Sequence, residues 1–199
     1  KRAEAYILPG IYTDGEPAVK YRGIFLNDEA PCLTSWVKQY YGTDFGDHRF
    51  YAQVCELILR LKGNFLWPAM WGWAFYADDS LNSKTADEMG VIIGTSHHEP
   101  MMRAHKEYTR RRKEVGPWDY IVNREGVDRF FQEGLERNKA YDNLITIGMR
   151  GDGDVAMGKG SDEENMATLD SVIKGQRELI HKVYGKDPAE VPQTWAIFT

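Results

Sequence analysis

The apolar residues of this chain fall into short runs separated by longer amphipathic segments, an alternation that is typical of α/β proteins. Five of these runs predict β-strands, namely Tyr21–Leu26, Asn64–Trp67, Val91–Thr95, Leu144–Met149 and Val191–Phe198. The third run opens with three β-branched residues, which suits a strand that is buried on both faces. Because strands that alternate with helices pair in parallel through right-handed crossovers, the pattern predicts one parallel sheet.

Helical periodicity fills the segments between the predicted strands. It is clearest in Arg49–Lys62, where apolar side chains recur every three or four positions and Gly63 follows as a stop signal. Another helix is predicted to start near Thr34 or Ser35, either of which can cap it. Further helices are predicted over Thr85–Met89, Pro100–Val115, Glu125–Ala140 and Glu163–Tyr184.

Three features of these segments have simple helical interpretations. Pro100 is a favoured first-turn residue and is predicted to open its helix. The acidic run Asp162–Glu164 lies where a first turn would complement the helix dipole. The basic run Arg110–Lys113 is most simply a solvated helix face.

Two parallel architectures fit this order of elements: a doubly wound open sheet, and a (β/α)₈ barrel that is present only in part. An open sheet of five strands would close as a domain at 199 residues, whereas a whole barrel takes about 250 residues. The fifth predicted strand reaches the end of the sequence without a helix to cover it, and this is the local sign of a truncated barrel. Both architectures stay open on the residues alone.

Composition excludes several classes of protein. A hydrophobic fraction of 42% is enough for a sizeable core, which rules out a disordered or fibrous chain. The formal net charge of −5 argues against a protein that binds by neutralising nucleic-acid phosphates or anionic lipids. No run approaches the roughly 18 apolar residues of a membrane span. Cys32, predicted in a loop, and Cys55, predicted in a helix, are interpreted as reduced, which leaves the compartment open.

Polar and aromatic residues follow each of the first four predicted strands. In chain order these groups are Asn27–Glu29, Trp67–Trp73, Ser96–Pro100 and Arg150–Asp154. The carboxyl ends of parallel strands lie along one edge of a sheet, and ligands bind there. The sequence therefore predicts one acidic cleft with aromatic walls, built from residues that are more than a hundred positions apart.

Each group has a simpler structural interpretation when it is taken alone. The first can be a capped turn, the second core packing, and the histidines the start of a helix. The glycine-flanked carboxylates are hardest to explain in this way, because Gly151 and Gly153 make a tight turn that lets a ligand approach the backbone.

Three classes of function use such a cleft. Paired carboxylates over an aromatic surface suit glycoside hydrolysis, and an arginine among them suits a sugar that carries a carboxylate. The first alternative is metal-assisted hydrolysis, although the spacing of the candidate ligands matches no zinc motif; those ligands are His97, His98, Glu99, Asp152 and Asp154. The second alternative is a non-catalytic carbohydrate-binding module, which uses aromatic residues but does not need so many carboxylates.

Five stretches of the sequence resemble glycoside hydrolase family 115, the xylan α-1,2-glucuronidases. They are Tyr21–Pro31, Leu57–Asn64, Leu66–Trp71, Gly94–Arg103 and Thr146–Asp154. The resemblance implies a (β/α)₈ TIM-type barrel of which about the first five β/α units are present. Residues 1–20 would then be a lead-in segment, and residues 21–199 the N-terminal part of the catalytic domain. It also implies an inverting hydrolase that removes glucuronic acid or its 4-O-methyl ether from glucuronoxylan, with no metal or organic cofactor.

The resemblance assigns roles by matching motif to motif. Asp154 is the candidate general acid or base, and Asp28 is a second carboxylate that either takes part in catalysis or orients the substrate. Arg150 would hold the uronate carboxylate. The remaining pocket residues would surround the sugar hydroxyls, and they are Asn27, Trp67, His97, His98 and Asp152.

The resemblance also implies features outside this stretch. The family pattern continues beyond Pro192–Thr194 to a Lys-Glu pair whose glutamate is expected to be functional, so we expect this stretch alone to be inactive. The expected partner is glucuronoxylan or its oligosaccharides, not nucleic acid or a membrane, and a homodimer of the full-length enzyme is compatible with the family. Because xylan is too large to enter a cell, we expect a secreted or periplasmic enzyme.

Overall fold

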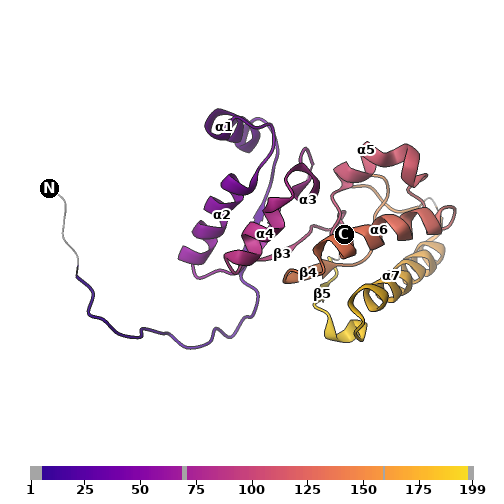
Figure 1. Cartoon of the computed structure of the whole chain (residues 1–199). Helices are drawn as coiled ribbons and strands as arrows, with labels where there is room; N and C mark the ends of the chain where they lie inside the picture. Colours follow the sequence, from indigo (N-terminus) through magenta and orange to yellow (C-terminus); the bar gives the residue numbers. More distant parts are fainter. Residues whose placement is uncertain (1–5, 69–70, 159, 197–199) are drawn as a thin grey trace.

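A parallel sheet of five short strands organises the chain (Figure 1). The computed structural model describes residues 6–68, 71–158 and 160–196. The strands are β1 (Gly23–Leu26), β2 (Phe65–Pro68), β3 (Ile92–Gly94), β4 (Asn143–Thr146) and β5 (Gln193–Thr194). Each strand pairs in parallel with the next one along the chain. The predicted parallel α/β sheet is therefore confirmed.

The order of the strands bears on the choice between the two architectures. A doubly wound sheet reverses its strand order at a switch point. Among the described residues no such reversal occurs, because β1 to β5 stand in the sheet in their sequence order. Sequential order is that of a barrel. The sheet is thus consistent with a partial barrel.

The last two strands are shorter than the sequence predicts. β4 ends at Thr146 rather than Met149, because the chain turns at Gly148, whose φ is +99°. Both backbone groups of Gly148 bond the buried side chain of Gln176, each at 2.7 Å, and this replaces further strand pairing. β5 covers only two residues of the predicted Val191–Phe198, of which residues 197–199 lie outside the described part.

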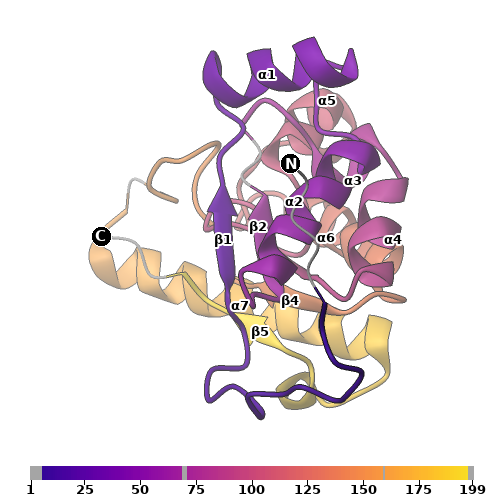
Figure 2. The ribbon, with the colours of Figure 1, turned by 90° about the vertical axis from the view of Figure 1, so that its left-hand side faces the viewer.

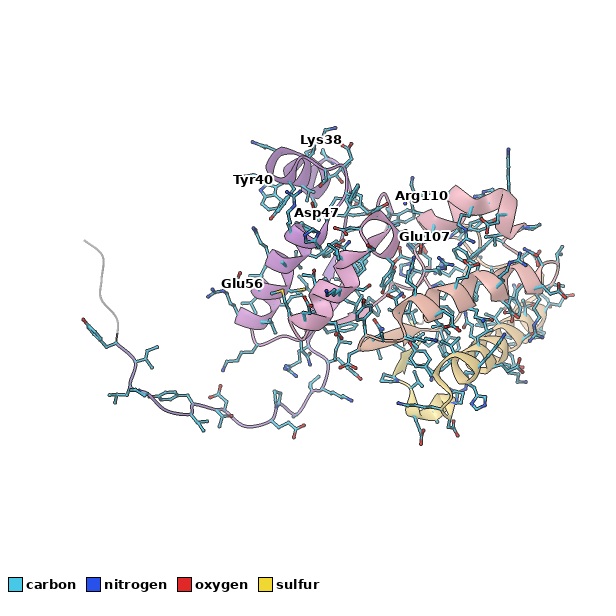
Figure 3. All side chains as sticks on the ribbon, in the orientation of Figure 1. Lys38, Tyr40, Asp47, Glu56, Glu107 and Arg110 are labelled. Carbon is cyan, nitrogen blue, oxygen red and sulfur yellow. The ribbon has the colours of Figure 1, made fainter. Side chains whose placement is uncertain are left out.

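Helices fill the connections, as predicted. They are α1 (Cys32–Tyr41), α2 (His48–Arg60), α3 (Phe75–Asp78), α4 (Leu81–Glu88), α5 (His105–Val115), α6 (Arg124–Asn138) and α7 (Asp162–Tyr184), with a 3₁₀ turn η1 (Pro188–Glu190) before β5. Asp47 caps α2 by accepting hydrogen bonds from the backbone of Arg49 and Phe50 (Figure 3). Ser161 and Glu164 form a capping box at α7, so its acidic first turn is confirmed.

Two helix starts differ from the prediction near the first and third strands. α1 begins at Cys32 instead of at Thr34 or Ser35, so Cys32 lies in a helix rather than in a loop. Both Cys32, which is exposed, and Cys55, which is buried in α2, are free thiols. α5 begins at His105 instead of at Pro100. Met101 and Met102 both have a φ of +59°, a conformation that an α-helix cannot contain.

The segment between β2 and β3 also contains more helix than predicted. α4 starts at Leu81, four residues before the predicted start at Thr85. The short helix α3 was not predicted, since its four residues are too few to show a helical period.

One face of the sheet packs against the helices, and the other is open. Leu66, Ile93 and Ile145 share the packed face and are almost fully buried. Helices α2, α4 and α6 lie to one side of β1 and β2 in Figure 2. On the opposite face Phe25 is 54% exposed, and its ring lies 6.1 Å from that of its neighbour Trp67. The open face is therefore aromatic.

Residues 6–22 lead into β1 and form neither helix nor strand. They run as an extended segment away from the helices (Figure 1), with an ion pair between Asp14 and Lys62 near the end of α2. Throughout the described ranges, no helix combines the length and the apolar composition that crossing a membrane requires.

Candidate active site

The residues after the first four strands converge at one edge of the sheet, as the sequence predicts. Figure 2 shows β1 pointing toward this edge, with α1 lying across it beyond the arrowhead. Contacts between side chains and backbone connect the ends of β1, β2, β3 and β4.

Asp28, after β1, fixes the segment that follows β2. Its carboxylate accepts hydrogen bonds from the backbone N–H groups of Trp71, Gly72 and Trp73 at 3.1, 2.9 and 2.7 Å. Burial raises the pKa of Asp28, although these three hydrogen bonds oppose the effect. The structure thus places Asp28 beneath Trp71 as an anchor, and its assignment as a catalytic carboxylate stays a prediction.

His97 and Arg150 both contact the same carboxylate oxygen of Asp154. Oδ1 of Asp154 lies 3.0 Å from Nε2 of His97 and 3.1 Å from Nε of Arg150. The side chain of Asp154 is 29% exposed, so solvent and a ligand can still reach it. The contact joins the end of β3 to the end of β4. These three predicted site residues are therefore brought together.

His98 lies beneath this group and is nearly inaccessible to solvent. Its ring is 4.9 Å from the rings of both Trp71 and His97. Burial lowers the pKa of His98 to about 4, and the neighbouring charge of His97 acts in the same direction. Its Nδ1 has no hydrogen-bond partner among the described residues. At neutral pH His98 is thus an uncharged imidazole that links the β2 and β3 ends.

Asp152 belongs to a different set of contacts from Asp154. Its carboxylate bonds the imidazole of His105 at 2.9 Å and the guanidinium of Arg112, both on α5. Burial raises the pKa of Asp152, but these hydrogen bonds outweigh it and hold the pKa below the ordinary value. The predicted solvated face Arg110–Lys113 is largely exposed, and two of its residues also make ion pairs: Arg112 bonds Asp152, and Arg110 bonds Asp78 at the end of α3. Arg110 is labelled in Figure 3.

The two remaining predicted residues are Asn27 and Trp67. Asn27 is exposed beside Asp28. Trp67 stands on the open face of β2, where its indole nitrogen would be 2.5 Å from a Cβ added at Gly94. A larger residue at position 94 would therefore have to displace the rings of Trp67 and Phe65.

Three residues near the site were not in the predicted set. Trp71 carries the ring contact with His98, and Trp195 lines a cavity of about 190 Å³ together with His97 and Arg150. His105 was missed because the helix predicted from Pro100 places it in the middle of a helix. Its position only eight residues after His97 was the sequence signal that both histidines could belong to the same site.

The candidate metal ligands predicted from the sequence are not grouped around a common point. Among the described residues, no three His, Cys, Asp or Glu side chains are grouped to hold an ion. Glu99, one of the candidate ligands, accepts a hydrogen bond from the Ser96 hydroxyl at 2.8 Å instead. The carboxylates of Asp152 and Asp154 bond different histidines, so the predicted ligands are divided between two contacts.

Comparison with known proteins agrees with the resemblance. Among solved structures, the chain is similar to a family GH115 4-O-methyl-α-glucuronidase with specificity for decorated arabinogalactans, with 34% sequence identity and a TM-score of 0.79. The match covers 89% of this chain and 24% of that protein, so the chain spans about a quarter of its relative. A search of curated proteins finds no match. The sequence profile of Glycosyl hydrolase family 115 matches residues 14–199, and the chain therefore belongs to that family.

Proposed function

We propose that the full-length protein carrying this chain hydrolyses the α-glycosidic bond of glucuronic acid or 4-O-methyl-glucuronic acid branches on plant polysaccharides. The observation that carries this proposal is the placement of Asp154 between His97 and Arg150 at the carboxyl edge of the sheet. The imidazole comes from the segment after β3, and the carboxylate and the guanidinium come from the loop after β4. Such a set can transfer a proton and also bind an anionic sugar.

The geometry suggests a division of labour. Arg150 contacts Asp154 through Nε, and the two terminal nitrogens of a guanidinium can grip a second carboxylate, that of a uronic acid. Asp154 would act as the general acid or base at the anomeric centre. In an inverting reaction a water attacks the anomeric carbon, one carboxylate takes its proton, and a carboxylic acid protonates the departing oxygen.

The second carboxylate of this mechanism has two candidates. Asp28 is one, and its hydrogen bonds to residues 71–73 favour a role in orienting the substrate through Trp71. The glutamate that the family resemblance expects beyond the fifth strand is the other. An inverting pair stands about 6.5–9.5 Å apart to admit the water.

The proposed barrel accounts for the open aromatic face. We infer that the sheet is the first part of a (β/α)₈ barrel, because its strands run in sequence order and one face lacks a helical layer. Strands supplied by further sequence would cover Phe25 and its neighbours. Since polymers of this size stay outside cells, a secreted or periplasmic location follows from the proposed substrate.

The proposed activity has two candidate substrates, and each can be tested directly. The family resemblance favours glucuronoxylan, whereas the similar solved enzyme is specific for decorated arabinogalactans. The full-length protein should be incubated with each polymer, and the released uronic acid and its anomer followed by NMR. Release of the β-anomer first supports an inverting glucuronidase, and the preferred polymer sets the specificity. Release of no uronic acid from either one would contradict the proposal.

The role of Asp154 is tested by Asp154→Asn in the full-length protein. We expect kcat to fall on the order of 10²- to 10⁴-fold, because the side chain can no longer exchange the proton. The melting temperature should change little, since the carboxylate is partly exposed. Asp170→Asn, on the exposed face of α7, is the matched control and should keep full activity. An active Asp154→Asn variant would remove Asp154 from the mechanism.

A further inference from the structure

The loop after β4 carries Arg150 and Asp154, the two groups on which the proposed chemistry depends. Its glycine-rich sequence favours a flexible backbone. Residues 150–154 include Gly151 and Gly153, and Gly153 has a φ of +99°. Glycine has the largest backbone freedom of all residues, so such a loop samples many conformations unless contacts restrain it. One backbone hydrogen bond, from Gly151 N–H to Val155 O at 2.9 Å, closes its base.

Contacts from α5 and the segment after it restrain the tip of this loop. Asp152 bonds Nε2 of His105 at 2.9 Å, and Arg112 adds two contacts through Nη1 and Nη2. The indole N–H of Trp118 donates to the backbone oxygen of Arg150 at 3.0 Å. These contacts come from residues that are more than thirty positions away in sequence.

The residues that make these contacts are themselves held in place. The ring of His105 packs against both Tyr108 and Trp118, with both ring centroids at 5.4 Å, and these two rings also contact each other at 4.6 Å. The guanidinium of Arg112 stacks over the ring of Tyr108 at 4.8 Å. Burial lowers the pKa of His105, although the hydrogen bond with Asp152 opposes this shift, so the imidazole is neutral at pH 7 and donates through Nε2. The clamp thus consists of His105, Arg112 and Trp118.

We propose that this clamp positions the loop after β4, so that His105, Arg112 and Trp118 are positioning residues for Arg150 and Asp154. Asp152 is then the point at which the clamp grips the loop and not a ligand of the sugar. The inference rests on the proposed function for its catalytic consequence, whereas the ordering of the loop stands independently of it. Displacements of about 1 Å at reacting groups cost up to about a hundredfold in rate, so loosening the loop should act mainly on kcat.

The test uses Arg112→Ala in the full-length protein, with Lys113→Ala on the same helix as the control of equal charge change. We expect kcat on the preferred polymer to fall about tenfold or more in Arg112→Ala while KM stays within about twofold. Arg112→Lys keeps the charge and one donor, and it should recover part of the loss. Lys113→Ala should match the parent.

A double-substitution cycle separates the clamp from direct substrate binding. If Arg112 and Asp152 act through one contact, the double variant Arg112→Ala with Asp152→Ala should not show the product of the two single effects. Its fold-decrease in kcat should be no more than about twice that of the more impaired single variant. If Asp152 binds the sugar, its substitution raises KM and the two effects multiply, and that result would overturn the proposal. Trp118→Phe removes the indole N–H together with the pyrrole part of the ring, and it provides an independent variant in which the bond to Arg150 is lost while an aromatic ring remains.

A second readout keeps the inference distinct from the proposed function. Hydrogen–deuterium exchange at residues 150–155 should become faster in Arg112→Ala and Trp118→Phe, and stay unchanged in Lys113→Ala. If the parent protein releases no uronic acid, the proposed function fails and the exchange rates alone decide whether the clamp orders the loop. Unchanged exchange at residues 150–155 in both Arg112→Ala and Trp118→Phe would refute the proposal that the clamp orders this loop.

Discussion

At the scale of single residues, the site joins charged groups to one buried neutral histidine. Asp154 has two partners at about hydrogen-bond distance, whereas His98 lies beneath them with only 5% of its surface exposed. The ring of His98 packs against the rings of both Trp71 and His97. Protonation of His98 would bury a positive charge beside His97, which is why its pKa is low.

His98 therefore makes the stability of the protein depend on pH. The unfolded chain binds a proton at this histidine near pH 6.5, whereas the folded chain does so only near pH 4, so stability falls as the pH drops through this window. Between pH 7 and pH 5 the loss from this residue is about 2 kcal/mol. We expect chemical unfolding to show this loss in the parent and not in His98→Phe, whereas His181→Gln on α7 keeps it. An NMR titration of His98 with a midpoint near 6.5 would contradict the prediction.

At the scale of elements, a buried ionic cluster joins α5 to α6 and to the turn before α5. Glu107 is 3% exposed and bonds Arg103, Arg137 and the backbone N–H of Ala104 (Figure 3). The guanidinium of Arg103 also stacks on Phe130 of α6 at 4.2 Å. This cluster fixes the start of α5, and with it the base of the clamp on the loop after β4.

Neutralising Glu107 should therefore be costly. In Glu107→Gln the guanidinium of Arg103, which is 4% exposed, loses one of its two carboxylate partners and keeps only the more exposed Glu133. Breaking a buried pair costs up to about 3–5 kcal/mol. Glu114→Gln removes an exposed partner of Arg111 on the same helix and should cost much less, because solvent screens an exposed ion pair. Thermal unfolding of both variants tests this contrast. Equal shifts in melting temperature would show that the cluster does not stabilise the fold.

Some of these elements and contacts could be predicted from the sequence, and others could not. Strand positions and the strand-end groups were predictable, because apolar periodicity and parallel topology act locally and regularly. The start of α5 was not, because the positive φ of Met101 and Met102 depends on tertiary contacts such as that between Met101 N–H and the oxygen of Thr146. Nor could sequence show that Asp152 contacts α5 while Asp154 contacts His97, since both carboxylates stand in one glycine-flanked run.

At the scale of the whole molecule, the sheet has two edges and one open face. Among the described residues, β1 pairs only with β2, and β5 pairs only with β4. The aromatic side chains of β1 and β2 lie on the face without helices, where Phe25 is half exposed. Exposed strand edges and apolar faces of this kind are unfavourable in water. Closure of the sheet into a barrel would cover both.

The barrel proposal predicts the behaviour of β1 in the full-length protein. In a parallel ladder, alternate residues bond opposite neighbours, so an edge strand protects only every second amide from exchange with solvent. If another strand closes the barrel beside β1, all four amides of Gly23–Leu26 should exchange slowly in a residue-resolved hydrogen–deuterium measurement. Amides of β2 bonded to β1 and β3 serve as the internal control, because they are protected in either architecture. Alternating fast and slow exchange along β1 would mean that the sheet stays open, and the barrel would then have to be abandoned in favour of an open parallel sheet.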